Sequence, residues 1–245
     1  MSRSIPPAAP PQKISVVVPF YNEGESISAL LEELCEVLDR TSASCEIIAI
    51  DDGSTDDTFA ILQAFALRWP ALKLARHLQN QGQASALWTG FKLASGDVVV
   101  TLDGDGQNDP HDIPGLVSKL AADEADMVSG YRQQRKDSLV RKLMSRTANA
   151  VRSSLLHDGV HDAGCALKAF RRAVVSSFVP IRTLYSFMPA MAVAAGFQVV
   201  EMPVNHRERK AGISKYGLRV MFWRPALDLL GMWWFRSRRL KEACL

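Results

Sequence analysis

The 245-residue sequence has few cysteines, no membrane-spanning apolar run and no Gly-rich dinucleotide fingerprint. Cys35, Cys45, Cys165 and Cys244 show neither CxxC nor CxxH spacing, which argues against a zinc site and favours a reducing compartment. Residues 1–12 are rich in Pro and Ser and have no apolar core, so they are predicted to be a disordered tail rather than a signal peptide. No GxGxxG follows the first apolar run, which disfavours a dinucleotide-dependent oxidoreductase.

Charge is distributed unevenly along the chain. The formal net charge is +3, yet residues 206–245 contain ten Lys or Arg against three Asp or Glu, a local +7 that leaves −4 for the remainder. This asymmetry indicates that the C-terminal part meets an anionic partner such as a phosphate, a lipid surface or a nucleic acid. A hydrophobic content of 47% is sufficient for the core of one large α/β domain with an appendage.

Short β-branched runs alternate with amphipathic segments over the first 130 residues. Strands are predicted at 13–19, 46–50, 72–75, 97–102 and 126–129, and helices at 26–40, 58–69, 81–94 and 113–122. Beyond them, the predictions are a basic helical stretch at 132–152, a late strand at 199–204, a polar loop at 205–217 and a helix at 218–239. The alternation predicts an α/β fold whose mainly parallel sheet is covered by helices on both faces.

Polar clusters follow three of the predicted strands at their carboxyl ends. These clusters are residues 20–23, 51–57 and 103–107. Ligands of open α/β sheets bind outside the carboxyl ends of the strands. We therefore expect the three clusters to share one crevice.

The third cluster contains two carboxylates separated by one glycine, Asp103-Gly104-Asp105. Bringing two anions together is unfavourable unless a cation lies between them, and oxygen ligands select Mg²⁺ or Mn²⁺, which in turn hold a diphosphate. Gln107 offers a further neutral oxygen. An isolated motif of this kind is more often a solvated turn, but the neighbouring acidic cluster shifts the balance to a metal site.

The second cluster offers acids for two different tasks. One aspartate can accept a hydrogen bond from a uracil or guanine N–H, and another can cap the following helix. Asp56 is well placed for capping, so Asp52 is assigned to the base.

Two basic segments could bind phosphates. Arg141 and Ser145 lie four residues apart, on one face of a predicted helix near Arg132, and guanidinium groups bind phosphate in a forked geometry. The glycine-containing loop 209–215 is a second cationic segment. A basic helix is, in isolation, more often simply a solvated face.

The last predicted helix combines aromatic and basic residues. Residues 218–235 are too short and too charged to span a bilayer. Aromatic side chains beside a basic tail suit a helix that lies in the headgroup region of an anionic membrane. Packing on the domain or in a dimer interface is an equally supported alternative.

Five motifs occur in a characteristic order. They are Val18-Pro19-Phe20-Tyr21-Asn22-Glu23, Asp51-Asp52-Gly53-Ser54-Thr55-Asp56, Asn80-Gln81-Gly82-Gln83-Ala84, Asp103-Gly104-Asp105-Gly106-Gln107 and Arg209-x-x-Gly212-x-Ser214-Lys215. Together they resemble family 2 glycosyltransferases of the GT-A fold, in the polyprenyl-phosphate branch that includes dolichol-phosphate mannose synthase. Two further segments, 162–168 and 205–207, resemble a bacterial subgroup associated with lipid A and polyprenyl-phosphate sugar donors.

The resemblance implies a role for each motif. The nucleotide would be bound by Pro19, Tyr21, Glu23, Asp52, Asn80, Gly82, Gln83 and Asp103. The metal, Mg²⁺ or Mn²⁺, would be held by Asp103, Asp105 and Gln107. Phosphate groups would be contacted by Arg132, Arg141, Ser145, Arg209 and Lys215, and the catalytic residues would be Asp105, Arg209 and Lys215.

The implied reaction is inverting transfer of a sugar from a nucleotide sugar, with UDP preferred over GDP, to an undecaprenyl- or dodecaprenyl-type phosphate. The product would serve envelope lipid or polysaccharide modification. The expected partners are these substrates and an anionic inner-membrane surface, not a nucleic acid. The enzyme would be cytoplasmic and associate peripherally with the membrane. Whether it forms a homo-oligomer is left open. The expected organisation is a tail (1–12), a GT-A domain (13–216) and an amphipathic membrane-interface helix with a basic tail (217–245).

Two alternatives accompany this interpretation. The first is a family 2 glycosyltransferase that acts on a saccharide or protein hydroxyl, which leaves the cationic loop and the basic helix without a task. The second is a non-catalytic nucleotide-binding, membrane-docking module, which would tolerate loss of the acids at 103 and 105.

Overall fold

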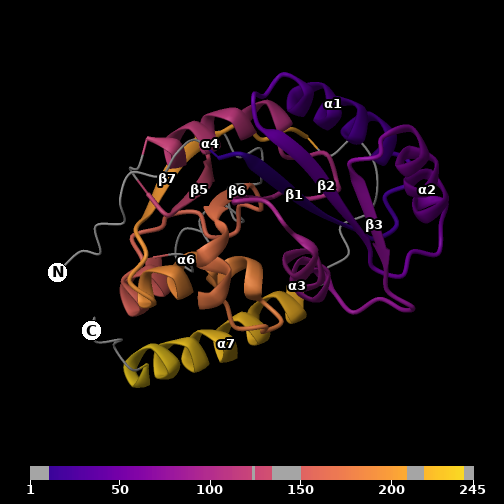
Figure 1. Cartoon of the computed structure of the whole chain (residues 1–245). Coiled ribbons are helices and arrows are strands. Elements are labelled where there is room, and N and C mark those ends of the chain that lie inside the picture. The colour runs from indigo at the N-terminus through magenta and orange to yellow at the C-terminus, as the bar shows by residue number, and fades with distance from the viewer. Residues whose placement is uncertain (1–10, 123–124, 134–149, 209–217, 240–245) are drawn as a thin grey trace.

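A computed structural model of the chain describes residues 11–122, 125–133, 150–208 and 218–239, with the side chains of the last helix described from residue 227 onward. The first half alternates strands and helices as predicted (Figure 1). Its elements are β1 (Lys13–Phe20), α1 (Ile27–Asp39), β2 (Ser44–Asp51), α2 (Thr58–Arg68), β3 (Leu72–Arg76), α3 (Gln83–Leu93), β4 (Val98–Thr101), a 3₁₀ turn η1 (Pro110–Asp112), α4 (Ile113–Ala121) and β5 (Met127–Arg132).

The second half contains a strand and an α-helix that the sequence pattern did not predict, together with an unpredicted 3₁₀ segment. Its elements are β6 (Lys168–Arg171), a 3₁₀ segment η2 (Arg172–Ser177), α6 (Leu184–Ala194), β7 (Val199–Val204) and α7 (Leu218–Arg238). The missed strand and α-helix are β6, which has only four residues, and α6, which is apolar on nearly all sides and contains Pro189, so neither shows a clear period. Arg132 ends β5 rather than beginning a helix, and most of the predicted helix 132–152 lies outside the described residues.

The seven strands form one sheet in the order β3-β2-β1-β4-β6-β5-β7. Only β6 runs antiparallel to its neighbours, so the prediction of a mainly parallel sheet is confirmed. Thr101 of β4 pairs with Lys168 of β6. Because of this reversal, the amino end of β6 lies at the same edge as the carboxyl ends of the other strands, which brings the 162–168 segment to that edge.

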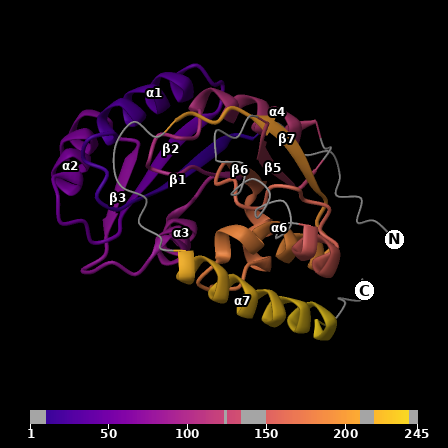
Figure 2. The same cartoon turned by 180° about the vertical axis from the view of Figure 1, so that it is seen from behind.

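Helices cover both faces of the sheet (Figures 1 and 2). Alternate strand residues point to opposite sides: Val16 and Val18 of β1 pack with α1, α2 and α4, whereas Val17 packs with α3 and α6. Each fully buried aliphatic side chain of this kind contributes roughly 1.5–3 kcal/mol.

Helix α7 joins the second face through one of its sides. Leu229, Met232 and Phe235 pack against the cluster that contains α3 and α6, and the Thr183 hydroxyl donates to Asp228 Oδ2 at 2.5 Å. Among the helices of the described part of the chain, none is long and apolar enough to cross a bilayer.

Candidate functional site

The loops after β1 and β2 are joined by hydrogen bonds. Asn22, at φ 51°, donates its N–H to Ser54 Oγ at 3.0 Å, and its Oδ1 accepts from the Thr55 N–H at 2.8 Å. Asp56 accepts from the N–H of Thr58, the first residue of α2, at 3.0 Å, although the N-cap residue of α2 is Asp57, whose side chain makes no capping hydrogen bond. The predicted convergence of the first two polar clusters is therefore present.

Asp52 organises the segment between β3 and α3. Its Oδ1 contacts His77 Nδ1 at 2.6 Å and accepts from the Gln81 N–H at 3.0 Å, and its Oδ2 accepts from the Gly82 N–H at 2.8 Å and from Asn80 Nδ2 at 3.0 Å. Both oxygens of this buried carboxylate thus serve the chain itself. The base-contacting role assigned to Asp52 stays a prediction.

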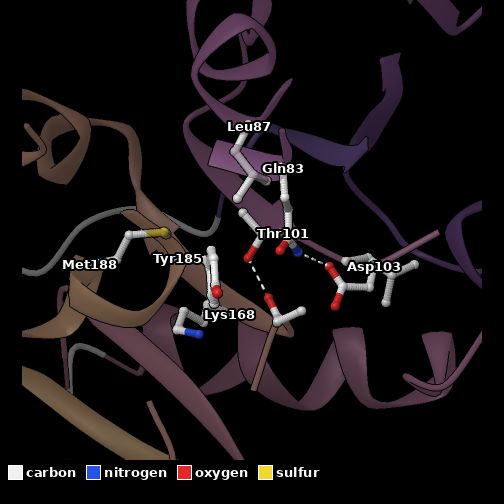
Figure 3. A pocket seen from close by; sticks show the side chains of 9 residues that line it. Gln83, Leu87, Thr101, Asp103, Lys168, Tyr185 and Met188 are labelled. Atoms are coloured by element: carbon white, nitrogen blue, oxygen red, sulfur yellow. Dashed lines mark hydrogen bonds between the residues drawn. The ribbon is translucent and has the colours of Figure 1, made fainter. Parts of the chain in front are cut away.

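The same segment reaches the third cluster. Gly82, at φ 92°, precedes α3, and Gln83 begins that helix. The Gln83 side chain donates through Nε2 to Asp103 Oδ1 at 2.5 Å (Figure 3). A continuous path of contacts therefore connects Asp52 with Asp103, and the three predicted clusters share one edge of the sheet.

Asp103 and Asp105 place two carboxyl groups close together after β4. Burial, and then the charge of Asp105, raise the pKa of Asp103 to about 7, although Lys168, Gln83 and Arg132 act in the opposite direction. Asp105 accepts from the Gln107 N–H at 3.1 Å across Gly106, which has φ 71°. A bound divalent cation would relieve this excess of negative charge, so the donor set fits Mg²⁺ or Mn²⁺.

The glycine between the two acids is required by packing. A Cβ on Gly104 would come within 2.4 Å of Phe20 Cδ1 and within 2.7 Å of the Pro19 carbonyl oxygen. Residue 104 must therefore lack a Cβ for the chain after β4 to lie against the end of β1 in this way. This contact holds the two carboxylates beside the predicted base-binding loop that contains Pro19, Tyr21 and Glu23.

Lys168 and Tyr185 were not predicted from the sequence, and both line a small hollow beside Asp103. The hollow is also lined by Gln83, Thr101 and Met188 (Figure 3). Lys168 is 1% exposed and donates through Nζ to the carbonyl oxygens of Ala163, at 3.2 Å, and Cys165. The pKa of this ammonium group is lowered, because the effect of burial exceeds the opposing effect of the charges of Asp162 and Asp103. The sequence motif at 162–168 includes Lys168, but only the antiparallel pairing of β6 with β4 places this segment beside Asp103.

Arg132 was predicted to bind a phosphate, and its guanidinium is held by Asp162. Nε and Nη2 donate to the two carboxylate oxygens at 2.7 Å each. Arg132 of β5 thus adds a second cation, beside Lys168 of β6, to the edge of the sheet that holds Asp103. Four other predicted phosphate or catalytic residues, Arg141, Ser145, Arg209 and Lys215, lie outside the described residues.

Two acids and one histidine form a separate group of possible metal ligands. Glu33, Asp109 and His111 bring their ligand atoms within 4.8 Å of one another. Arg207 already lies among them: Nη1 and Nη2 donate to Glu33 at 2.7 Å each, and Nη2 is 2.7 Å from Asp109 Oδ1. Since a guanidinium supplies the positive charge there, Asp103 and Asp105 form the better candidate for a divalent ion.

Comparison with known proteins adds three findings. Residues 15–178 match the family described as glycosyl transferase family 2. The chain is 40% identical over 208 residues to an undecaprenyl-phosphate 4-deoxy-4-formamido-L-arabinose transferase of Sodalis glossinidius, covering 84% of this chain and 63% of the relative. It is 37% identical over 227 residues to a dodecaprenyl-phosphate galacturonate synthase of Rhizobium johnstonii, covering 91% and 67%.

Two solved structures share the fold. A glucosyl-3-phosphoglycerate synthase from Mycobacterium tuberculosis, in complex with Mn²⁺, UDP and phosphoglyceric acid, has TM-score 0.70 and 20% identity, with 94% of this chain and 80% of that chain covered. A mannosyltransferase from Pyrobaculum calidifontis, in complex with GDP-Man and Mn²⁺, has TM-score 0.67 and 23% identity, with 96% and 66% covered. These likenesses confirm the expected GT-A fold. The chain spans just under two thirds of the first curated relative.

Proposed function

We propose, since the chain belongs to glycosyl transferase family 2, that it transfers a sugar with inversion from a nucleotide sugar, UDP-linked in preference to GDP-linked, to an undecaprenyl- or dodecaprenyl-type phosphate. The observation that carries the donor half is the crowded pair Asp103 and Asp105 beside the nucleotide-binding loops. The names of the two curated relatives support the acceptor half.

Asp103 and Asp105, with the amide oxygen of Gln107, would hold Mg²⁺ or Mn²⁺. Bound there, the ion would offset negative charge on the departing nucleoside diphosphate. Gln83 keeps Asp103 oriented through its 2.5 Å hydrogen bond, and Gly104 keeps both acids packed against the end of β1. The chain's own residues thus prearrange the acidic pair.

The acceptor phosphate is already ionised at pH 7, so no carboxylate base is required to activate it. The task of the protein is alignment and charge compensation. We assign Arg132, Arg141 and Ser145 to the acceptor phosphate and Arg209 and Lys215 to the diphosphate. Attack from the face opposite the leaving group produces inversion at the anomeric carbon.

Helix α7 supports peripheral contact with an anionic inner-membrane surface. Its outward side exposes Leu227, Leu230 and Trp234, spaced i, i+3 and i+7, at 65%, 61% and 60%, and Trp233 at 50%. Basic residues follow in the last turn. An apolar face beside positive charge suits the headgroup region of anionic lipid.

Flotation with anionic and neutral vesicles tests this contact. Replacing Trp233 and Trp234 together by Ser should abolish binding to anionic vesicles, whereas Leu67→Ser, at an 88% exposed site on α2, should leave it unchanged. If vesicles never retain the chain and the double variant instead converts a dimer to a monomer, a second copy covers this face.

The reaction is tested with the full chain, a panel of UDP- and GDP-sugars, undecaprenyl phosphate, and Mn²⁺ or Mg²⁺. A lipid-phosphate monosaccharide identified by mass spectrometry is the expected product. Asp105→Ala should abolish its formation and preserve the fold, while Glu36→Gln, an exposed change on α1, should have no effect. Near-normal turnover of Asp105→Ala, or transfer only to hydroxyl acceptors, would overturn the proposal.

A further inference from the structure

Arg207 connects three parts of the chain that are far apart in sequence. Its guanidinium binds Glu33 of α1 through both Nη atoms at 2.7 Å, and Nη2 also lies 2.7 Å from Asp109 Oδ1. Its backbone N–H donates to the Gln107 carbonyl oxygen at 2.8 Å. Arg207, three residues beyond the end of β7, therefore holds both a side chain and the main chain of the loop that follows the metal motif.

Neighbouring contacts reinforce this connection. Asn108 and His206 form an antiparallel bridge, and the Asn205 N–H donates to Asp112 Oδ2 at 2.7 Å. His111 Nδ1 lies 3.1 Å from Glu33 Oε1 and 3.0 Å from Asp109 Oδ1. The segments 205–207 and 107–112 are thus joined along their length, with the guanidinium of Arg207 between two carboxylates.

The loop held in this way begins at a predicted metal ligand. Asp105 and Asp109 are separated by three residues, one of which is Gly106 in a left-handed conformation. Within the loop, Asp105 accepts a hydrogen bond from the Gln107 N–H at 3.1 Å. Fixing Gln107 and Asp109 from outside therefore limits how far Asp105 can move away from Asp103.

We propose that Arg207 is a positioning residue that holds the Asp105–Asp109 loop in the shape in which Asp103 and Asp105 share one divalent cation. This inference rests on the proposed function, because it presumes that these two acids bind a metal. Arg207 itself does not contact the ion. Its effect resembles that of outer-shell partners elsewhere, whose loss weakens metal affinity roughly 10- to 100-fold.

The test measures Mn²⁺ binding to the full chain in the presence of UDP, without sugar or lipid, from the electron paramagnetic resonance signal of free Mn²⁺. Arg207→Ala should raise the Kd for Mn²⁺ roughly 10- to 100-fold while circular dichroism shows a folded chain. Arg207→Lys keeps the positive charge but loses the two-pronged guanidinium, so its Kd for Mn²⁺ should lie between those of the wild-type protein and Arg207→Ala. Arg40→Ala, which removes an exposed pair with Glu36 on the same α1, should change the Kd by less than about two-fold.

Hydrogen exchange gives a second readout that a general loss of stability would not reproduce. Arg207→Ala should accelerate exchange of the amides at 106–109 and leave those of β1 and β2 unchanged. If Arg207→Ala does not fold, Arg207→Lys and Glu33→Gln take its place, with the same direction expected in both measurements.

The outcomes separate the two proposals. Unchanged Mn²⁺ affinity in a folded Arg207 variant, together with loss of binding in Asp105→Ala, overturns the positioning role and leaves the proposed function intact. Wild-type protein that binds no Mn²⁺, or an Asp105→Ala variant that binds it normally, overturns the metal assignment and the positioning role with it.

Discussion

Two acidic sites lie at opposite edges of the same sheet, and their surroundings differ. At the amino edge, Glu46 is 3% exposed; its carboxylate lies 2.9 Å from Lys13 Nζ and 2.8 Å from Lys73 Nζ, and accepts from the Ser15 hydroxyl at 2.6 Å and the Ser95 N–H at 2.9 Å. At the carboxyl edge, Asp103 has the Gln83 amide as its hydrogen-bond donor and Asp105 as its acidic neighbour.

The pKa values of the two carboxyl groups move in opposite directions. Burial raises the pKa of Glu46, but hydrogen bonds from Lys73, Ser15, Ser95 and Lys13 more than offset this, and the net pKa lies well below the usual range. Burial and the charge of Asp105 instead raise the pKa of Asp103 to about 7. Lysines and hydrogen-bond donors thus compensate the charge of Glu46, whereas the pKa of Asp103 is raised by its surroundings, a perturbation that is common at functional sites.

The largest effect should come from replacing Asp103 with Asn. This change preserves the shape of the side chain and removes its charge, so transfer should fall by about 10³-fold, in line with the loss of a key electrostatic group. Without metal, the free energy of unfolding at pH 8 should stay the same or increase, because repulsion with Asp105 is removed. Steady-state kinetics and urea unfolding measure the two quantities.

Asp97 provides a matched control for Asp103. It precedes β4 as Asp103 follows it, and its Oδ2 accepts from the backbone N–H groups of Gln12 and Lys13 at 3.0 and 3.2 Å. Asp97→Asn should leave turnover unchanged. A similar loss of turnover in both variants would contradict the functional distinction between the two edges.

Replacing Glu46 with Gln should affect stability rather than catalysis. The change removes the counter-charge of Lys13 and Lys73, but both lysines are partly exposed, so the free energy of unfolding should fall by about 1.5–3 kcal/mol, the range for hydrogen bonds to charged groups. Turnover per folded molecule should be preserved. Urea unfolding and kinetics well below the melting temperature measure both, and a loss of turnover without a loss of stability would contradict this assignment.

The two sites should also respond differently to pH when metal is chelated with EDTA. Glu46 is ionised in the folded chain at a lower pH than in the unfolded chain, so its stabilising contribution is present above about pH 4.3 and is lost as the pH falls further. Asp103 holds its proton up to about pH 7, so its contribution declines as the pH rises from about 4 to 7. Glu46→Gln should weaken the loss of stability at acid pH, to which Glu33, Asp56 and Asp109 also contribute, and Asp103→Asn should weaken the decline toward neutral pH.

The carboxyl edge was largely predictable from the sequence, and the contacts across it were not. Buried strands followed by polar residues predicted that Asp52 and Asp103 would share one edge, because the ends of parallel strands meet there. Lys168 escaped prediction because β6 is four residues long and reverses direction. The pair of Glu33 and Arg207, separated by 174 positions, depends on how β7 is placed beside β5, which no local pattern encodes.

The smallest effect should come from making the carboxyl edge resemble the amino edge. Gln83→Lys would place a cation where the neutral Gln83 amide now meets Asp103 at 2.5 Å. A nearby positive charge favours the ionised carboxylate, so the pKa of Asp103 should fall. The free energy of unfolding of the metal-free chain should therefore rise by about 1 kcal/mol at pH 8. The cation also competes with the metal, so the Kd for Mn²⁺ should rise by less than about ten-fold.

Gln81→Lys is the control, because it adds the same charge at an exposed position of the same segment and so separates local from long-range effects. Equal changes in the two variants would mean that Asp103 responds to the overall charge of the edge, not to its immediate donor.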